Sequence, residues 1–125
     1  MNINSYFKSV IDQSESQVVI CDLSHTIIYM NPVAIKQQAK HGGSGLVGKS
    51  LLNCHNNDSV EKILKTIEWF KQSKENNVVH EFYNEKQNKD NYIVALRDEN
   101  GELIGYYERQ RYRDKDLTPF YDYGT

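Results

Sequence analysis

Two short stretches of this 125-residue sequence carry residues that could do chemistry. Residues 43–50 read GSGLVGKS, which matches the phosphate-loop pattern G-x-x-x-x-G-K-[ST]. Cys54 and His55 follow shortly after and place a thiol next to an imidazole in the sequence. The first stretch would bind a nucleotide phosphate, and the second could supply a heme-iron ligand, a hydrogen bond to an acidic ligand, or a nucleophile.

The elements predicted around residues 43–50 do not support a phosphate loop. Such a loop follows a buried strand and leads directly into a helix whose free N–H groups face the phosphate. Here the preceding segment, AIKQQAKH, is polar and helical in pattern, and the following segment, SLLNCHNND, is soon broken by asparagines. The pattern also lacks the crossover helices that join parallel strands. We therefore interpret this stretch as a glycine-rich connection and not as a nucleotide site.

Cys54 and His55 remain open to a structural interpretation, in which His55 caps backbone groups near the helix that follows. No Ser-His-Asp or paired-carboxylate arrangement stands out, so we predict no catalytic residue and no enzyme. The sequence also predicts no metal site, because the spacing of its histidines and cysteines matches no zinc pattern (Cys21, His25, His41, Cys54, His55 and His80).

Composition and charge narrow the possible partners. Hydrophobic residues make up 38% of the chain and charged residues 26%, and the formal net charge is −2. Without a basic excess we expect no nucleic-acid partner, and the longest apolar runs are too short to span a membrane. The N-terminus has no signal-peptide pattern, and the two cysteines lie far apart in the sequence. These features predict a cytoplasmic protein with free thiols.

Hydrophobic periodicity predicts an α+β fold. Apolar spacing indicates a helix over residues 3–11, capped by Asn4 or Ser5, and a hairpin over residues 17–30. Asn31 and Pro32 are typical of a helix start, and Asp58 with Glu61 fits a capping box for a long helix that ends near residues 72–74. The remaining strands are predicted over residues 78–83, 91–97 and 102–109, with a turn at residues 98–101. The result is a five-stranded antiparallel sheet with helices on one face.

Four segments resemble elements of the PAS domain family and occur in the family's order over roughly residues 5–113. VVICDLSHTIIYMNPVA resembles the first hairpin and helix start, and GLVGKSL resembles an element written h-h-G-[KR]-S. VEKILKTIEWF resembles the long connecting helix, and YIVALRDENGELIGYYE resembles the last hairpin. The NCH…S stretch before the long helix is similar to a bacterial PAS subgroup.

The resemblance implies a PAS-like domain over residues 15–113, between an N-terminal amphipathic helix at 1–14 and a C-terminal tail at 114–125. It implies a stand-alone sensor that binds a small ligand or a signalling protein, signals in trans and forms a homodimer. One alternative is a heme- or flavin-binding redox or gas sensor that uses Cys54 and His55. The flavin photosensor pattern G-x-N-C-R-F-L-Q is not matched around Cys54. Another alternative is a protein-interaction module with a filled core.

The predicted ligand-binding residues come from three parts of the chain. Cys54 and His55 precede the long helix, and Ile67 belongs to its apolar face. By analogy with the PAS arrangement, the last hairpin contributes Ile93, Ala95, Ile104 and Tyr106 from the inner face of the sheet. The mixed-charge run at residues 108–116 is interpreted as a solvated edge strand.

Overall fold

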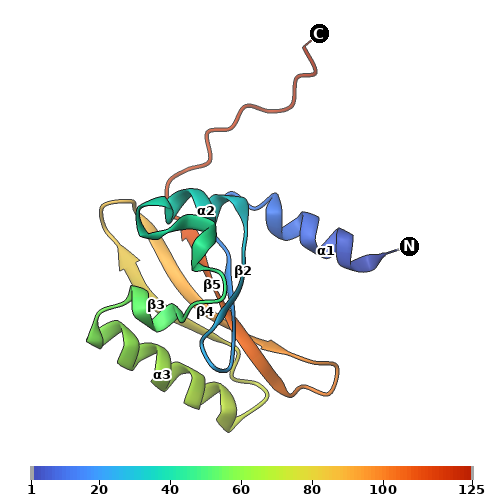
Figure 1. The fold of residues 1–125 in the computed structure, drawn as a ribbon. Helices are drawn as coiled ribbons and strands as arrows, with labels where there is room; N and C mark the ends of the chain where they lie inside the picture. The colour runs from blue at the N-terminus through green and yellow to red at the C-terminus, as the bar shows by residue number, and fades with distance from the viewer. Residues whose placement is uncertain (1, 125) are drawn as a thin grey trace.

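A computed structural model describes residues 2–124 and has one five-stranded antiparallel sheet with helices over one face (Figure 1). The strand order is β2-β1-β5-β4-β3, which confirms the predicted fold class. The predicted N-terminal helix and C-terminal tail segments end at Met1 and Thr125, which lie outside the described residues. The elements are α1 (Ile3–Asp12), β1 (Val19–Asp22), β2 (Ile27–Met30), α2 (Pro32–Gln37), η1 (Ala39–His41), η2 (Gly43–Leu46), η3 (Leu51–Cys54), α3 (Asn57–Gln72), β3 (Val78–Asn84), β4 (Lys89–Arg97) and β5 (Leu103–Tyr112).

Asn31 begins α2, as predicted, and also joins three other parts of the chain. Its Oδ1 accepts hydrogen bonds from the backbone N–H of Ala34 at 3.0 Å and of Val18 at 2.9 Å. Its Nδ2 donates to the carbonyl oxygens of Ile11 at 3.0 Å and Ser16 at 3.1 Å. Because the side chain is fully buried, these four bonds fix the end of α1 against β1 and α2.

The glycine-rich connection extends the edge of the sheet and does not form a phosphate loop. The N–H of Gly48 donates to the carbonyl of Ile27 at 2.7 Å, and the N–H of Ile27 donates to the carbonyl of Lys49 at 2.9 Å. Gly48 has a φ of 92°, a conformation that favours glycine. Since the Gly48 N–H is bonded to β2, it is not free to bind a phosphate.

Helix α3 starts two residues earlier than its predicted capping box. Oδ1 of Asn56 accepts from the N–H of Ser59 at 2.9 Å, so Asn56 is the N-cap and Asp58 lies in the first turn. The predicted capping box of Asp58 with Glu61 is therefore wrong. The helix end is confirmed, and its buried face consists of Ile63, Thr66, Ile67 and Phe70.

Strand β5 lies in the middle of the sheet, between β1 and β4. The interpretation of residues 108–116 as an edge strand is therefore wrong, and Glu108 in this run is buried. The neighbouring Gly105 is required by close packing, because a Cβ added there would lie 2.3 Å from the carbonyl oxygen of Cys21. This glycine allows β5 to approach β1 closely.

Ile104 was expected on the inner face, and this placement is wrong because the side chain is 54% exposed. The register shifts between Leu96 and Arg97, so that Leu96 pairs with Gly105 while Arg97 pairs with Leu103. Ile104 is the extra residue of this β-bulge, which breaks the alternation of faces. Leu103 packs against the core in its place.

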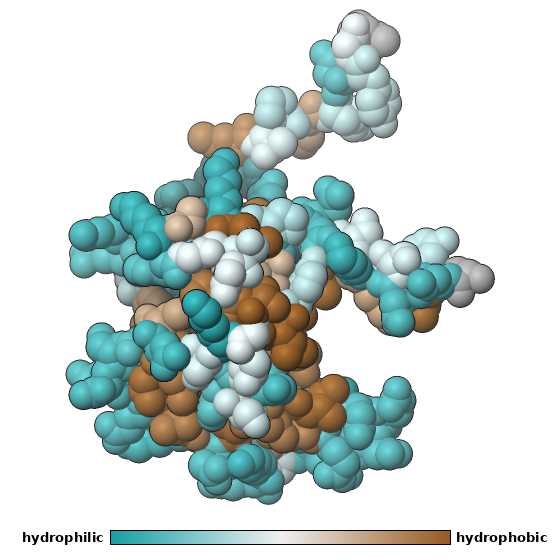
Figure 2. Space-filling model, viewed as in Figure 1, coloured by the Kyte–Doolittle hydropathy of each residue, from teal (hydrophilic) through white to brown (hydrophobic). Residues whose placement is uncertain are grey.

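Helix α1 and the C-terminal segment extend away from the sheet (Figure 1). None of the ten residues of α1 is buried, so this helix does not cover the outer face of the sheet in the single chain. Figure 2 shows apolar side chains gathered in the middle of the viewed face and hydrophilic ones around its rim. Within residues 2–124, every helix is too short or too polar to cross a bilayer.

Candidate functional site

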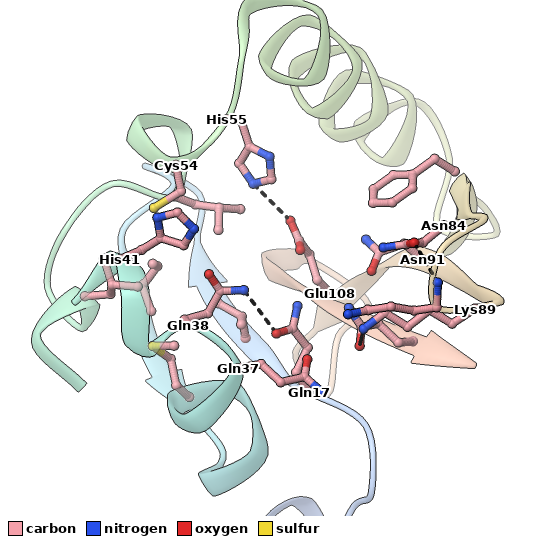
Figure 3. A pocket seen from close by; sticks show the side chains of 18 residues that line it. Gln17, Gln37, Gln38, His41, Cys54, His55, Asn84, Lys89, Asn91 and Glu108 are labelled. Atoms are coloured by element: carbon pink, nitrogen blue, oxygen red, sulfur yellow. Dashed lines mark hydrogen bonds and ion pairs between the residues drawn. The ribbon is translucent and has the colours of Figure 1, made fainter. Parts of the chain in front are cut away.

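A cavity of about 450 Å³ lies between the inner face of the sheet and the segment from α2 to η3 (Figure 3). Pockets of this size accommodate small-molecule ligands. The cavity has an apolar wall from Val19, Ile27, Met30, Leu46, Leu51 and Phe82. Its polar lining contains more residues and consists of Gln17, Gln37, Gln38, His41, Cys54, His55, Asn84, Gln87, Lys89, Asn91, Glu108 and Gln110.

Strand pairing explains why polar groups gather on the inner face at this end of the sheet. Ile93 pairs with Glu108, Asn91 pairs with Gln110, and alternate residues along each strand share a face. The inner face of β4 therefore changes from Ile93 to the polar residues Asn91 and Lys89. The inner face of β5 changes in the same way, from Tyr106 to Glu108 and Gln110. This change from apolar to polar residues on both strands separates the polar cavity from the apolar core.

Glu108 is the central ionisable group of the cavity. Its side chain is 6% exposed, and within residues 2–124 its Oε1 has no hydrogen-bond partner. Burial, together with the nearby Glu81 carboxyl, raises the pKa of Glu108 to about 8. In the ligand-free protein near neutral pH, Glu108 is therefore mostly a neutral carboxylic acid.

Glu81 is a second buried carboxyl and has a similar environment. The Nδ2 of Asn91 donates to its Oε1 at 2.7 Å, while its Oε2 has no hydrogen-bond partner within residues 2–124. Burial raises the pKa of Glu81. Lys62 from α3 donates to the backbone carbonyl of Glu81 at 2.9 Å and not to the carboxyl. The Asn91 amide therefore lies beside two carboxyl groups, and within residues 2–124 no lysine or arginine is paired with either of them.

His55 faces Glu108 across the cavity (Figure 3). Its Nε2 lies 3.6 Å from Oε1 of Glu108, which is longer than a hydrogen bond. Burial lowers the pKa of His55 and raises that of Glu108, so both groups favour their neutral forms. Cys54 also lines the cavity and is a free cysteine.

Polar side chains on either side of Glu108 are already paired with one another. Nε2 of Gln38 donates to Oε1 of Gln17 at 3.2 Å, and this bond links α2 to the start of β1. On the other side, Nζ of Lys89 donates to Oε1 of Gln110 at 2.9 Å. Burial lowers the pKa of Lys89. Among the described residues, Glu108 is the lining residue that keeps a buried side-chain oxygen without a hydrogen-bond partner.

The apolar half of the inner face contains its own polar contact. The hydroxyl of Tyr106 and Nδ1 of His25 lie 2.8 Å apart and form a hydrogen bond. Burial raises the pKa of Tyr106, and it raises that of Cys21 to about 12. Both groups stay protonated at neutral pH, so this contact is a satisfied part of the core. Among residues 2–124, no group of three or more His, Cys, Asp or Glu side chains could hold a metal ion.

The structure brings only two of the seven predicted ligand-binding residues to the cavity, Cys54 and His55. The buried side chains of Ile67, Ile93 and Tyr106 belong to the hydrophobic core, and Ala95 packs against it. Ile104 lies outside, as described above.

Sequence reasoning missed Glu108, Lys89 and Asn91, although a signal for them was present. Since strand residues alternate between faces, placing Tyr106 and Ile93 inside also places Glu108 and Asn91 inside.

The surroundings of His55 do not fit a heme iron on its Nε2. That atom faces the Glu108 carboxyl at 3.6 Å, so an iron bound there would occupy the space that the carboxyl fills. The donor set of the cavity, mostly amides, instead suits hydrogen bonding to a polar organic molecule.

Comparison with known proteins gives matches in fold and not in sequence. No protein-family model matches the chain, and no curated protein matches it significantly. The PAS domain of a protein from Colwellia psychrerythraea is similar with a TM-score of 0.66 at 15% identity, over 88% of this chain and 96% of that chain. A C-terminal domain from Streptococcus mutans is similar with a TM-score of 0.66 at 16% identity, over 86% and 83% of the two chains. The Aer2 receptor from Vibrio cholerae, described as a dual PAS-heme oxygen sensor, gives 0.53 at 18% identity, over 76% and 91%.

One antiparallel sheet, one covering layer of helices and a cavity between them define an α+β domain with room for a small molecule. Within that class, the chain has the fold of a PAS domain. The resemblance inferred from its sequence is thereby confirmed at the level of the fold. Its assignment to a bacterial subgroup stays a prediction.

Proposed function

We propose that this domain is a sensor that binds a small polar molecule in the cavity and transmits the binding event through α1. The observation that carries the proposal is the buried Glu108, whose Oε1 is unpaired within residues 2–124 and lines a polar cavity of about 450 Å³. Buried polar atoms in folded proteins are almost always hydrogen-bonded. An unpaired one that lines a cavity therefore favours a site that a ligand completes. The proposal includes no catalysis by this chain.

Two alternatives receive less support from the same geometry. In the heme- or flavin-binding alternative that uses Cys54 and His55, an iron on Nε2 of His55 would need the space that the Glu108 carboxyl fills. A pure interaction module would have a filled core, whereas this chain has a cavity with a dozen polar lining residues. The sensory role is also consistent with the Vibrio cholerae neighbour, which is described as an oxygen sensor.

A hydrogen-bonded route connects the cavity to α1. Gln38 and Gln17 line the cavity and are bonded to each other, and the next residue, Val18, is bonded to Asn31. Asn31 in turn holds the carbonyl of Ile11 at the end of α1. A ligand that moves Gln17 or Gln38 would change the restraint on α1, and a population shift of α1 would be the output signal.

We also propose that α1 pairs with α1 of a second copy of this chain, and that this homodimer transmits the signal. The helix exposes an apolar stripe at helical spacing, formed by Ile3, Phe7 and Val10, with Phe7 58% exposed. Exposed apolar stripes of this kind favour pairing between helices.

The two free thiols, Cys21 and Cys54, agree with the expected cytoplasmic location.

Hydrogen–deuterium exchange with native mass spectrometry tests the sensor proposal. Protein purified without added cofactor should carry a small non-covalent ligand, or accept one, and exchange in α1 (residues 3–12) should change on binding. Gln38→Trp, which places a bulky side chain in the cavity wall, should abolish both effects. A protein that binds small molecules equally well with and without Gln38→Trp would contradict the proposal. Added hemin should give no shifted Soret band, and a stoichiometric one would instead support the heme alternative.

A further inference from the structure

We propose that the cavity selects a small organic cation, whose ammonium group pairs with the Glu108 carboxylate. This inference rests on the proposed function, since it names the ligand class of the same site. Glu108 lies in the middle of the cavity, opposite His55 and between two amide-rich walls (Figure 3).

The free oxygen of Glu108 defines the chemistry that the ligand must supply. Oε1 is buried, has no hydrogen-bond partner within residues 2–124, and lies too far from Nε2 of His55 to be bonded. Burying a carboxylate without a partner is costly, and a charged hydrogen-bond donor is the partner that best offsets this cost. An ammonium group carries three such donors.

The nearby Glu81 strengthens the preference for a positive charge. Its Oε2 also lacks a partner within residues 2–124, and its Oε1 is held by Asn91, which lines the same cavity. Both carboxyl groups lie beside one neutral amide, and the Lys62 ammonium, which bonds the backbone carbonyl of Glu81, lowers the pKa of Glu81. Ionisation of Glu108 therefore gives this part of the cavity a negative potential. A cation would relieve the repulsion between them.

The positive side chain that lines the cavity does not compete for this role. Nζ of Lys89 is bonded to Gln110 and lies 5.5 Å from the centroid of the Tyr112 ring. Within residues 2–124 Lys89 forms no ion pair with Glu108, so the free oxygen of Glu108 is left for an ammonium group of the ligand. The two remaining ammonium donors of Lys89 can bond a hydroxyl or carbonyl oxygen of the same ligand. The glutamine and asparagine side chains around it can accept or donate hydrogen bonds to hydroxyl or carbonyl groups of the same ligand.

Proton balance gives the pairing a measurable signature. Burial and Glu81 raise the pKa of Glu108 to about 8, so the ligand-free site holds a proton near neutral pH. When an ammonium compound binds, the carboxylic acid gives this proton to solvent and the resulting carboxylate pairs with the ammonium. The other titratable groups around the site are Glu81, His55, His41, Cys54, Lys89 and, from α3, Lys62, whose ammonium lowers the pKa of Glu81. At pH 7 we expect close to one proton to be released for each ligand bound.

Isothermal titration calorimetry with charge-matched probes tests the inference. The ammonium probes are ethanolamine, putrescine and tyramine, and their alcohol counterparts are ethylene glycol, 1,4-butanediol and tyrosol. We expect at least one ammonium probe to bind, and its alcohol counterpart to bind at least about tenfold more weakly, as removal of a charged hydrogen bond predicts. The enthalpy should vary with the ionisation enthalpy of the buffer, which reports the released proton.

Variants of the full chain separate the possible failures. Glu108→Gln keeps the shape of the side chain and should weaken binding of the ammonium probe at least about tenfold. Glu102→Gln makes the same change at an exposed glutamate beside β5 and should leave the affinity for the ammonium probe unchanged. The cation proposal is overturned if no ammonium probe binds, if the alcohols bind equally well, or if Glu108→Gln has no effect.

The anion 4-hydroxyphenylacetate shows whether only the cationic ligand class is wrong or whether the cavity is not a ligand site. If this anion or an alcohol binds and Gln38→Trp abolishes that binding, the cavity remains a ligand site and the cation class is wrong. If no probe of any charge binds, both the cation class and the proposed sensory site lose their support.

Discussion

Nε2 of His55 and Oε1 of Glu108 lie 3.6 Å apart in a cavity where burial disfavours the charge of each. The two groups are close enough to form an ion pair but too far apart for a hydrogen bond. Near neutral pH the ligand-free site therefore holds a neutral imidazole and a neutral carboxylic acid. The charge state of this pair therefore depends on pH.

Glu108→Gln should stabilise the protein more as the pH rises. The folded-state pKa of Glu108, about 8, lies above its ordinary value of 4.5, so folding favours the protonated form. The stability from this group is fully present below pH 4.5 and is lost as the pH rises toward 8, by up to about 1.4 kcal/mol per pH unit. Urea denaturation of the wild type and the variant at pH 5, 6.5 and 8 should show a difference in unfolding free energy that grows in favour of Glu108→Gln. A difference that does not change with pH would contradict the raised pKa.

Asn31→Ala should lower the free energy of unfolding by about 2–4 kcal/mol, because it leaves several buried backbone groups without their partners. Asn56→Ala is the matched control, since Asn56 caps α3 but is exposed. That change should cost only about 1 kcal/mol. Equal losses in urea denaturation would show that Asn31 acts only as a helix cap.

Gly105→Ala should destabilise the protein by about 3 kcal/mol or more, because the new Cβ would meet the backbone of Cys21 at 2.3 Å. Gly45→Ala is the control, because a Cβ at that position meets no atom within 4 Å. It should leave the stability unchanged or raise it by up to about 1 kcal/mol. Thermal unfolding measures both variants. A Gly105→Ala protein with the wild-type Tm would mean that β5 and β1 lie further apart.

Ile93→Ala and Ile104→Ala make the same chemical change on adjacent strands, but the two losses of unfolding free energy should differ widely. Ile93 is fully buried, so its truncation should cost about 2–5 kcal/mol. Ile104 is 54% exposed in the bulge, so its truncation should change the stability by less than about 0.5 kcal/mol. Comparable losses in urea denaturation would place Ile104 inside and remove the bulge.

Phe7→Glu should convert a homodimer to a monomer, because it puts a charge in the apolar stripe of α1. Ser9→Glu adds the same charge elsewhere on the same helix and should leave the dimer intact. Light scattering after size-exclusion chromatography measures the mass of each variant. A wild-type chain that is monomeric at all accessible concentrations would contradict the proposed pairing.

Most of the fold could be predicted because its signals are local. The Asn31-Pro32 start of α2, the Asp98–Gly101 turn and the alternation around Ile93 each follow from residues close in sequence. The start of α3 could not be fixed in this way. Asn56, Asn57 and Asp58 are all good capping residues, so their tertiary surroundings decide which one is used.

The candidate site was harder to predict because it departs from the rule that inner faces are apolar. Cys54 and His55 were found from their chemistry, whereas Glu108 and Lys89 look like surface residues in a charged segment. The bulge that exposes Ile104 depends on the pairing of β4 with β5, and no single residue in the hairpin marks it. Long-range pairing therefore decides where both the polar cavity and the exposed isoleucine lie.

The oxygen and the nitrogen of the Asn31 side chain bond different parts of the chain, and this has an evolutionary consequence. Its oxygen serves β1 and α2, while its nitrogen serves the end of α1 and the segment that follows it. A descendant that lost the helix before β1 would still need the oxygen but would have less use for the nitrogen. Aspartate or serine would then suffice at this position. An asparagine here should therefore be inherited together with the preceding helix, and its replacement should accompany the loss of that helix.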